Sequence, residues 1–67
     1  MLNKFAKILK ELRISKNLTQ TEFAKEIKTT QRKISYWESS KVEPDIDSLW
    51  IISDYFKISV DELIGKN

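Results

Sequence analysis

Residues 18–38 read LTQTEFAKEIKTTQRKISYWE, and their spacing is the most informative in the chain. Thr19 and Glu22 form a capping box that predicts the start of a short helix, and Thr30 can cap a second helix about three residues after the first one ends. Two short helices with so short a connection must cross steeply and bury their apolar sides against each other. The residues that this crossing would bury are Phe23, Ala24, Ile27, Ile34 and Trp37.

The segment before this stretch also has the pattern of a helix. Its apolar residues recur at i, i+3, i+4 and i+7, the spacing of one buried helix face. These residues are Phe5, Ile8, Leu9 and Leu12. We expect this helix to end near Lys16, with Asn17 in the left-handed conformation that is common at helix ends.

Two more helices are expected in the rest of the chain. Pro44 closes a loop, after which Asp45 or Asp47 can cap a fourth helix. The inward residues of that helix would be Leu49, Ile52 and Phe56. A second capping box at residues 59–62 predicts a final helical turn that Gly65 ends. No stretch alternates with period two long enough for a strand, so the sequence predicts a compact all-α fold of five helices.

The composition allows one small domain over residues 1–67 and excludes several classes of function. The chain contains no Cys and no His, so it has no disulfide and lacks the ligands of ordinary zinc, haem and iron–sulfur sites. Catalysis by His or Cys is excluded too, and a single Gly argues against a glycine-rich nucleotide-binding loop. We therefore expect a protein that is not an enzyme and that carries neither a metal nor a cofactor.

Charge is distributed unevenly along the chain. Residues 1–41 contain ten Lys and Arg and four Glu, a net charge of +6, whereas residues 42–67 contain two Lys and six acidic residues, a net charge of −4. This division predicts that one face of the protein binds a polyanion while the other keeps it soluble. Chance segregation of charge on a helical surface is the alternative.

The apolar runs indicate neither a secreted protein nor a membrane protein. The first run is broken at every third residue by Lys4, Lys7 and Lys10, which does not fit a signal peptide. No run approaches the length needed to span a membrane. A basic amphipathic helix on a membrane surface is an alternative, but its apolar face is needed for the core. We expect a cytoplasmic protein with no membrane partner.

The outward side of the helix expected at about residues 31–39 carries side chains that hydrogen-bond or stack. They are Gln31, Arg32, Ser35 and Tyr36, with Lys33 at the flank. Arg and Gln have the paired donors and acceptors that distinguish guanine and adenine in the major groove. A helical bundle that binds no DNA can also have a polar third helix. The polar face, the helix spacing and the basic N-terminal part together favour double-stranded DNA as the partner.

Four motifs occur together in the chain. They are LTQTEFA at residues 18–24, ISYWE at 34–38, Pro44, and ISVDEL at 58–63. In combination they resemble the phage-repressor and Cro-type (XRE-like) helix-turn-helix family over nearly the whole chain. The resemblance implies a five-helix domain that binds a pseudo-palindromic operator as a homodimer, with its third helix in the major groove. It also implies a bacterial or phage transcriptional regulator, and we expect a repressor.

The resemblance implies roles for individual residues. Gln20 is similar to a residue that contacts phosphate and braces the recognition helix, and Arg13 with Glu38 matches a pair that ties the first helix to the third. An ordinary surface ion pair worth about 0–1 kcal/mol is the alternative for that pair. The expected base contacts are Thr30, Gln31, Arg32, Ser35 and Tyr36. The expected phosphate contacts are Thr19, Gln20, Lys28, Lys33 and Lys41.

The sequence departs from the family pattern at several positions. Lys28, Ser40 and Lys57 stand where the family usually has glycine after a helix. A non-glycine residue in the left-handed conformation costs about 1 kcal/mol, so we expect either strain or an altered turn at Lys28 and Lys57. Tyr36 replaces an Arg or Gln common at its position, which leaves open whether it reads a base or packs against thymine methyls or sugars.

The fourth helical segment has more large apolar residues than an inward stripe requires. We expect Trp50 and part of the Tyr55 side chain to pack in the core, and the other surplus apolar residues to form a dimer interface. The expected interface residues are Ile51, Tyr55, Ile58, Val60 and Ile64. Two-fold pairing would place two recognition helices about 34 Å apart, one turn of DNA. The same patch would bind a protein partner if the chain were an antitoxin or an adaptor, which is the alternative function.

Overall fold

The computed structural model describes residues 3–66, with the backbone alone for residue 3. This part of the chain forms five helices and no strand, which confirms the predicted all-α fold. They are α1 (Asn3–Ser15), α2 (Gln20–Glu26), α3 (Gln31–Glu38), α4 (Ile46–Phe56) and α5 (Val60–Ile64). The predicted domain also included residues 1, 2 and 67, which lie outside the described residues.

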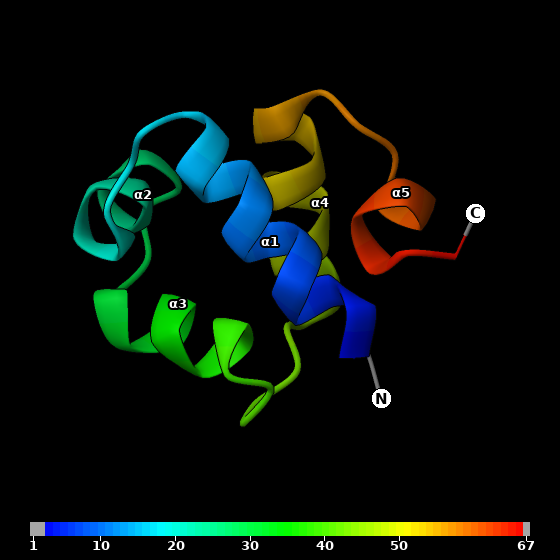
Figure 1. Cartoon of the computed structure of the whole chain (residues 1–67), viewed down its shortest axis with the longest axis horizontal. Coiled ribbons are helices and arrows are strands. Elements are labelled where there is room, and N and C mark those ends of the chain that lie inside the picture. Colours follow the sequence, from blue (N-terminus) through cyan, green and yellow to red (C-terminus); the bar gives the residue numbers. More distant parts are fainter. Residues whose placement is uncertain (1–2, 67) are drawn as a thin grey trace.

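The helices are arranged around α1. Figure 1 shows α1 running through the middle of the molecule, with α2 and α3 on one side, α5 on the other and α4 behind it. Both α3 and α5 pack against α1, and α2 packs against α3 as the short connection predicted. The beginning of α1 lies close to the end of α5, because a Cβ placed on Gly65 would come within 2.7 Å of the Lys4 Cβ.

One hydrophobic core joins all five helices. Its buried members are Phe5, Leu9, Phe23, Ala24, Ile27, Ile34, Trp37, Ile52 and Leu63. The other predicted inward residues, Ile8, Leu12, Leu49 and Phe56, are partly buried at its edge. The aromatic ring of Phe23 lies 5.7 Å from that of Tyr55 and 5.4 Å from that of Phe56, centroid to centroid, so α2 is held against α4 as well as against α3.

The predicted helix starts are present. Thr19 and Ser59 each accept a hydrogen bond from the backbone N–H three residues on, and the Glu at that position reaches back, so both capping boxes are confirmed. Thr30 caps α3 by accepting from the Lys33 N–H at 3.2 Å. Of the two candidates for the start of α4, Asp45 occupies the capping position.

Four helices are followed by a non-glycine residue in the left-handed conformation. These residues are Asn17, Lys28, Ser40 and Lys57, with φ between 58° and 62°. The next N–H then reaches back five residues, as from Thr29 to the Ala24 carbonyl at 2.8 Å, which is the Schellman arrangement. The left-handed backbone predicted at Asn17 is confirmed. At Lys28 and Lys57 the turn keeps this geometry, and each bears strain of about 1 kcal/mol.

The expectation that Trp50 packs in the core is wrong. Its exposed fraction is 64%, whereas Ile52 is fully buried. Two residues along an α-helix correspond to a rotation of about 200°, so a helix that turns Ile52 inward must turn Trp50 outward. None of the helices between residues 3 and 66 is long and apolar enough to cross a membrane.

Candidate nucleic-acid interface

The turn between α2 and α3 is built by backbone hydrogen bonds. Lys28 takes the left-handed conformation, and its N–H donates to the Lys25 carbonyl at 3.3 Å while the Thr29 N–H donates to the Ala24 carbonyl. Thr30 follows directly as the N-cap of α3, which begins at Gln31. Because Ala24 is small and buried, α2 and α3 cross closely, and the outward side of α3 projects from the molecule.

The exposed side of α3 is polar and lies opposite its buried residues. Ile34 is fully buried and Trp37 is 4% exposed, so these two side chains fix the rotation of the helix. The predicted base-contacting residues on the other side are Gln31, Arg32 and Tyr36, which are exposed, and Ser35, which is half-buried. The fifth, Thr30, is exposed at the helix start, and its hydroxyl oxygen already accepts from the Lys33 N–H.

Gln20 connects the exposed side of α3 to the interior. The Gln31 Nε2 donates to the Gln20 Oε1 at 2.6 Å, and the Gln20 Nε2 donates to the Glu38 Oε1 at 3.1 Å. The bracing role that the resemblance implied for Gln20 therefore has a structural basis on both sides of the residue. The single side chain of Gln20 thus links the first and the last turns of α3.

Arg13 and Glu38 form the pair that the resemblance implied. The Arg13 Nε and Nη2 donate to the two Glu38 carboxylate oxygens at 2.7 and 3.0 Å, and Nη1 donates to the Leu18 carbonyl at 2.7 Å. The side chains are only 10% and 5% exposed, which contradicts the alternative of an ordinary surface pair. The hydrogen bond to Glu38 is the main cause that raises the pKa of Arg13. Since α1 carries Arg13 and α3 carries Glu38, the pair fixes the two helices to each other.

The predicted phosphate contacts surround the exposed side of α3. Lys28, Lys33 and Lys41 are exposed, as is Thr19, and Gln20 is half-buried. The Lys41 Nζ lies 5.9 Å from the centre of the Tyr36 ring, close enough for a cation–π interaction between two residues of the proposed interface. Lysines at the start of α3, in the turn before it and in the loop after it thus give this surface a positive border.

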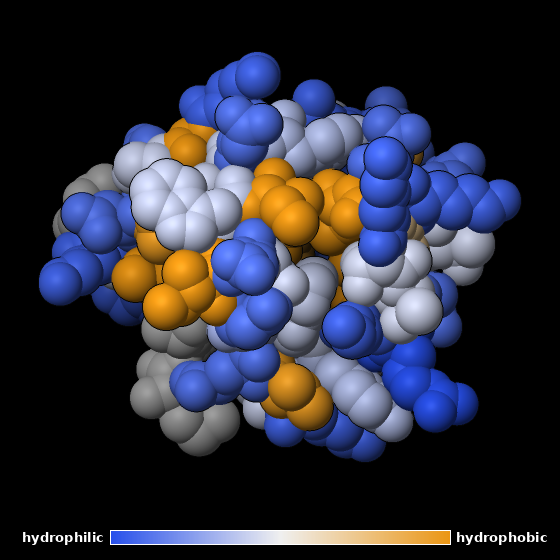
Figure 2. All heavy atoms as spheres, turned by 180° about the vertical axis from the view of Figure 1, so that it is seen from behind, coloured by the Kyte–Doolittle hydropathy of each residue, from blue (hydrophilic) through white to orange (hydrophobic). Residues whose placement is uncertain are grey.

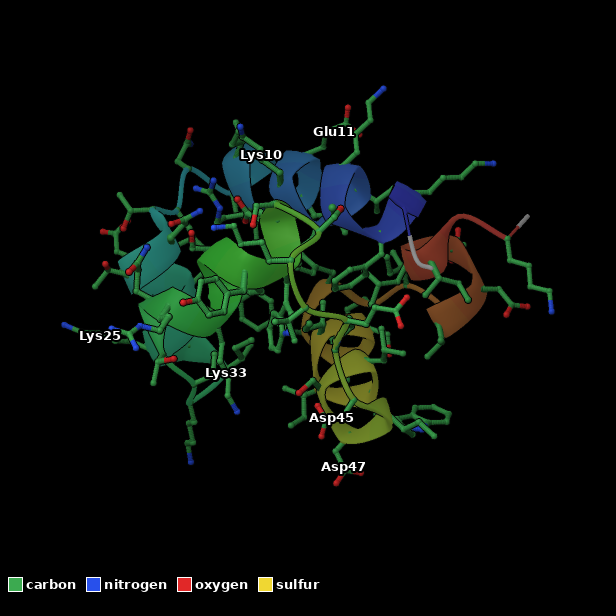
Figure 3. The ribbon with its side chains drawn as sticks, turned by 90° about the horizontal axis from the view of Figure 1, so that it is seen from below. Lys10, Glu11, Lys25, Lys33, Asp45 and Asp47 are labelled. Carbon is green, nitrogen blue, oxygen red and sulfur yellow. The ribbon has the colours of Figure 1, made fainter. Side chains whose placement is uncertain are left out.

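Lys33 also lies near the acidic side chain of Asp45, the residue that caps α4. The pKa of Asp45 is lowered, mainly by a hydrogen bond with the Ser48 side chain and least by the charge of Lys33. Figure 3 shows Lys33 on the same side of the molecule as Asp45 and Asp47, whereas Lys10 and Glu11 lie across the molecule on α1. Lys33 is therefore at the edge of the basic surface. No three acidic side chains of residues 3–66 are grouped so that they could hold a metal ion.

The residues of the expected dimer interface are only partly available. Ile51 is 49% exposed, but Tyr55, Ile58, Val60 and Ile64 are half-buried. The Tyr55 ring packs against Phe23, and its hydroxyl donates to the Glu26 carboxylate at 3.3 Å. Burial, followed by the Glu26 charge, raises the pKa of Tyr55.

Sequence reasoning named Ile51 but missed two more exposed apolar residues on the same helix, Ile46 and Trp50. We call Ile46, Trp50 and Ile51 the α4 patch; they are 71%, 64% and 49% exposed. Figure 2 shows the face of the molecule on which α4 lies in front, where hydrophobic side chains reach the surface at several places. The i, i+4 spacing of Ile46 and Trp50, out of phase with Leu49 and Ile52, is the signal that could have located this patch.

Comparison with known proteins places this fold in a family. Residues 9–63 match the model of the helix-turn-helix family. The chain is 41% identical over 61 residues to the HTH-type transcriptional activator BcrR of Enterococcus faecalis, covering 91% of this chain and 30% of that protein. It is 34% identical over 61 residues to the HTH-type transcriptional regulator ImmR of Bacillus subtilis strain 168, covering 91% of this chain and 48% of that protein.

The chain thus spans less than half the length of either relative. No solved structure matches the chain significantly. The family model nevertheless covers α2, α3, α4 and the turns between them. The chain belongs to the helix-turn-helix family, and the resemblance predicted from its motifs is confirmed.

Proposed function

We propose that this chain is a sequence-specific domain for double-stranded DNA that regulates transcription, with α3 as its recognition helix. The observation that supports the proposal most strongly is the exposed side of α3, where Gln31, Arg32 and Tyr36 project opposite the buried Ile34 and Trp37. An α-helix fits the major groove of B-DNA, and there each base pair presents a distinct pattern of donors and acceptors. The domain acts by binding and not as an enzyme, and we expect it in the cytoplasm.

Base recognition is assigned to the exposed residues of α3. Arg32 presents paired donors that match guanine O6 and N7, and Gln31 presents an amide that matches adenine. Tyr36 offers an aromatic edge to thymine methyl groups or sugars. Thr30 and Ser35 have short hydroxyl side chains that can hydrogen-bond to either kind of base edge.

Phosphate contacts are assigned to the border of the same surface. Lys28 and Lys41 lie in the turns before and after α3, and Lys33 lies at its flank. Thr19 and Gln20 lie at the start of α2 and complete the set. Contacts of this kind determine affinity and its dependence on salt, whereas base contacts determine which sequence is bound.

The proposal is tested by binding measurements with Gln31→Ala. On the site preferred by the wild-type chain, the variant should lose about 1–3 kcal/mol of binding free energy, and it should discriminate less at one base pair. On random DNA it should bind nearly as well as the wild type, because its phosphate contacts are intact. Equal losses on the preferred site and on random DNA would falsify the assignment of Gln31.

A homodimer on a two-fold symmetric operator is part of the proposal, and the α4 patch is the surface that supports it. Apolar side chains as exposed as those of Ile46 and Trp50 contribute to the free energy of association when a second surface buries them. Two recognition helices about 34 Å apart would span one turn of DNA.

Repression remains a prediction within this proposal. One relative bears the name of an activator and the other that of a regulator. A bound domain represses when its operator overlaps a promoter. Expression of a reporter gene downstream of the selected site should fall when the chain is present, and a rise would contradict repression without affecting the proposal of DNA binding.

The α4 patch also supports a second candidate function, that of an antitoxin or adaptor that uses the fold to bind a protein. Trp50 is the kind of residue that anchors protein interfaces, and its exposed fraction is 64%. Under this candidate Trp50→Ala would abolish capture of one defined partner. Under the proposed function it would instead alter the dimer, so sedimentation of the purified chain distinguishes the two.

A further inference from the structure

The outward face of α4 has a regular order of charged and apolar side chains. Four exposed residues follow one another at i, i+3, i+4 and i+7, namely Asp47, Trp50, Ile51 and Asp54. Residues seven apart on an α-helix lie two turns apart and within about 20° of each other around its axis. We call these four residues the α4 stripe, an apolar pair that lies between two aspartates.

The aspartates of the α4 stripe are free to meet a partner. Within residues 3–66, no hydrogen bond or ion pair involves the side chain of Asp47 or Asp54. Figure 3 shows Asp47 pointing away from the other helices. Neither α4 nor α5, which packs against it, contains a basic residue. The α4 stripe therefore presents apolar area at its centre and negative charge at both ends.

The spacing of the α4 stripe is that of a contact between two helices. A helix that lies along another one meets it through residues at i, i+3, i+4 and i+7, with apolar side chains in the middle of the contact and charges at its margin. The helix α4 has 11 residues, so a partner helix of about three turns matches its length. The order of the side chains thus indicates a helical partner.

Charge distinguishes the possible occupants of the α4 stripe. A second copy related by two-fold symmetry would place α4 against α4. In the antiparallel arrangement Asp47 lies opposite the Asp54 of the other copy, and in the parallel arrangement each aspartate lies opposite itself. Both arrangements bring like charges together, which opposes association. A helix with Lys or Arg at both ends of an apolar pair places opposite charges together instead.

We infer that the α4 stripe is a docking site for a basic amphipathic helix of another protein. The apolar residues of that helix lie against Trp50 and Ile51, and its basic residues lie against the two aspartates. The inference rests on the second candidate function and deepens it, because it names the chemistry of the partner. A second copy and such a helix compete for Trp50, so the partner also opposes the proposed homodimer.

A pair of synthetic peptides provides the probe. The lysine peptide is an alanine-rich helix without Trp or Tyr, in which two lysines seven residues apart flank a leucine pair. The glutamate peptide has glutamate in place of both lysines. In calorimetric titrations the wild-type chain should bind the lysine peptide at least about ten-fold more tightly than the glutamate peptide. Added salt should weaken this complex, because it screens the charge pairs.

Trp50 reports where the lysine peptide binds. Its exposed fraction is 64%, whereas that of Trp37 is only 4%. Burial of Trp50 should therefore shift the tryptophan emission of the chain to shorter wavelength. Binding of the lysine peptide without such a shift would place the complex on another surface and overturn the inference.

Exchange of the charges is the sharpest test. The double variant Asp47→Lys/Asp54→Lys should prefer the glutamate peptide, and Asp47→Asn/Asp54→Asn should discriminate between the peptides by less than about two-fold. Glu11→Lys changes an exposed charge on α1, across the molecule from Asp47, and should keep the wild-type preference. Thermal unfolding of each variant, followed by circular dichroism, shows whether the fold is retained.

The outcomes separate failure of the inference from failure of the candidate function. Equal affinity for the two peptides, or a lysine preference that persists in Asp47→Lys/Asp54→Lys, overturns the inference. If the lysine peptide fails to bind while sedimentation shows a homodimer that Trp50→Ala disrupts, a second copy is the occupant and the inference is overturned too. A partner that is lost in Trp50→Ala but has no basic amphipathic helix overturns the inference and leaves the second candidate function intact.

Discussion

The exposed side of α3 and the α4 patch are both open to solvent, but they differ in what lies beneath them. Behind Gln31, hydrogen bonds continue through Gln20 to the buried Arg13–Glu38 pair. The side chains of Trp50 and Ile46 are exposed on α4, and within the described part of the chain no hydrogen bond connects them to the interior. The first surface is polar and held by directional hydrogen bonds, whereas the second is apolar.

Because of this difference, the two surfaces are suited to recognise different kinds of partner. Reading a base edge requires donors and acceptors at fixed positions, and a buried network can fix them. Association through apolar area is non-directional and needs no such network. The two surfaces are therefore expected to respond differently to substitution, and the following variants test that expectation in order of decreasing effect.

Removal of Glu38 should have the largest effect. Glu38→Ala leaves the Arg13 charge buried without its partner, so the free energy of unfolding should fall by about 3–5 kcal/mol, measured by urea unfolding with circular dichroism. Glu11→Ala, at an exposed position of α1, should change it by less than about 0.5 kcal/mol. Replacing Arg13 and Glu38 together by Met should recover much of the loss, because no unpaired charge remains. A loss below 1 kcal/mol in Glu38→Ala would show that the pair does not hold α1 to α3.

Trp50→Ala should act on association and leave the fold alone. We expect it to weaken the homodimer by about 2 kcal/mol or more, while the unfolding free energy of the monomer changes by less than about 0.5 kcal/mol. Sedimentation equilibrium with and without the operator measures the first quantity. Ile14→Ala is the control, since Ile14 is 53% exposed but lies on α1. A wild-type chain that stays monomeric in both conditions contradicts the dimer.

Much of the fold could be predicted because its signals are local. The two capping boxes, the cap at Thr30 and the left-handed Asn17 depend on residues within one turn of each other, and the structure contains all of them. The apolar spacing identified the buried residues for a similar reason. The pairing of Arg13 with Glu38, 25 residues apart, followed only from resemblance to the family.

Other features depend on how the helices pack and could not be predicted in this way. Large apolar side chains on both sides of α4 suggested that Trp50 was buried, because the sequence does not show which side of the helix faces the core. The position of Lys33 near Asp45 depends on the angle between α3 and α4. The double use of Gln20 requires that the start of α2 lie against both the first and the last turn of α3.

The two strained lysines offer a smaller and closely matched test. Lys28→Gly and Lys57→Gly each relieve a left-handed backbone, so each should raise the free energy of unfolding by up to about 1 kcal/mol. The greater flexibility of glycine in the unfolded chain offsets part of this gain. Only Lys28→Gly removes a charge beside α3, so only this variant should bind DNA more weakly. Equal effects of the two variants on DNA affinity would contradict the placement of Lys28 at the interface.

The smallest expected effect concerns Lys41. Lys41→Ala should weaken binding to preferred and random DNA alike and lower the slope of log affinity against log salt by about one. Lys10→Ala removes the same charge from α1, away from Lys33 in Figure 3, and should leave the slope nearly unchanged. A slope that stays the same in Lys41→Ala would exclude a direct phosphate contact.

Selection of bound sequences from random double-stranded DNA, at two salt concentrations, tests the central claim that α3 reads DNA sequence. The wild type should enrich a short motif at both concentrations. Arg32→Ala should lose the preference for guanine at one position of that motif, and its remaining preferences should persist. No enriched motif in the wild type, or an identical motif for the wild type and Arg32→Ala, would contradict the account.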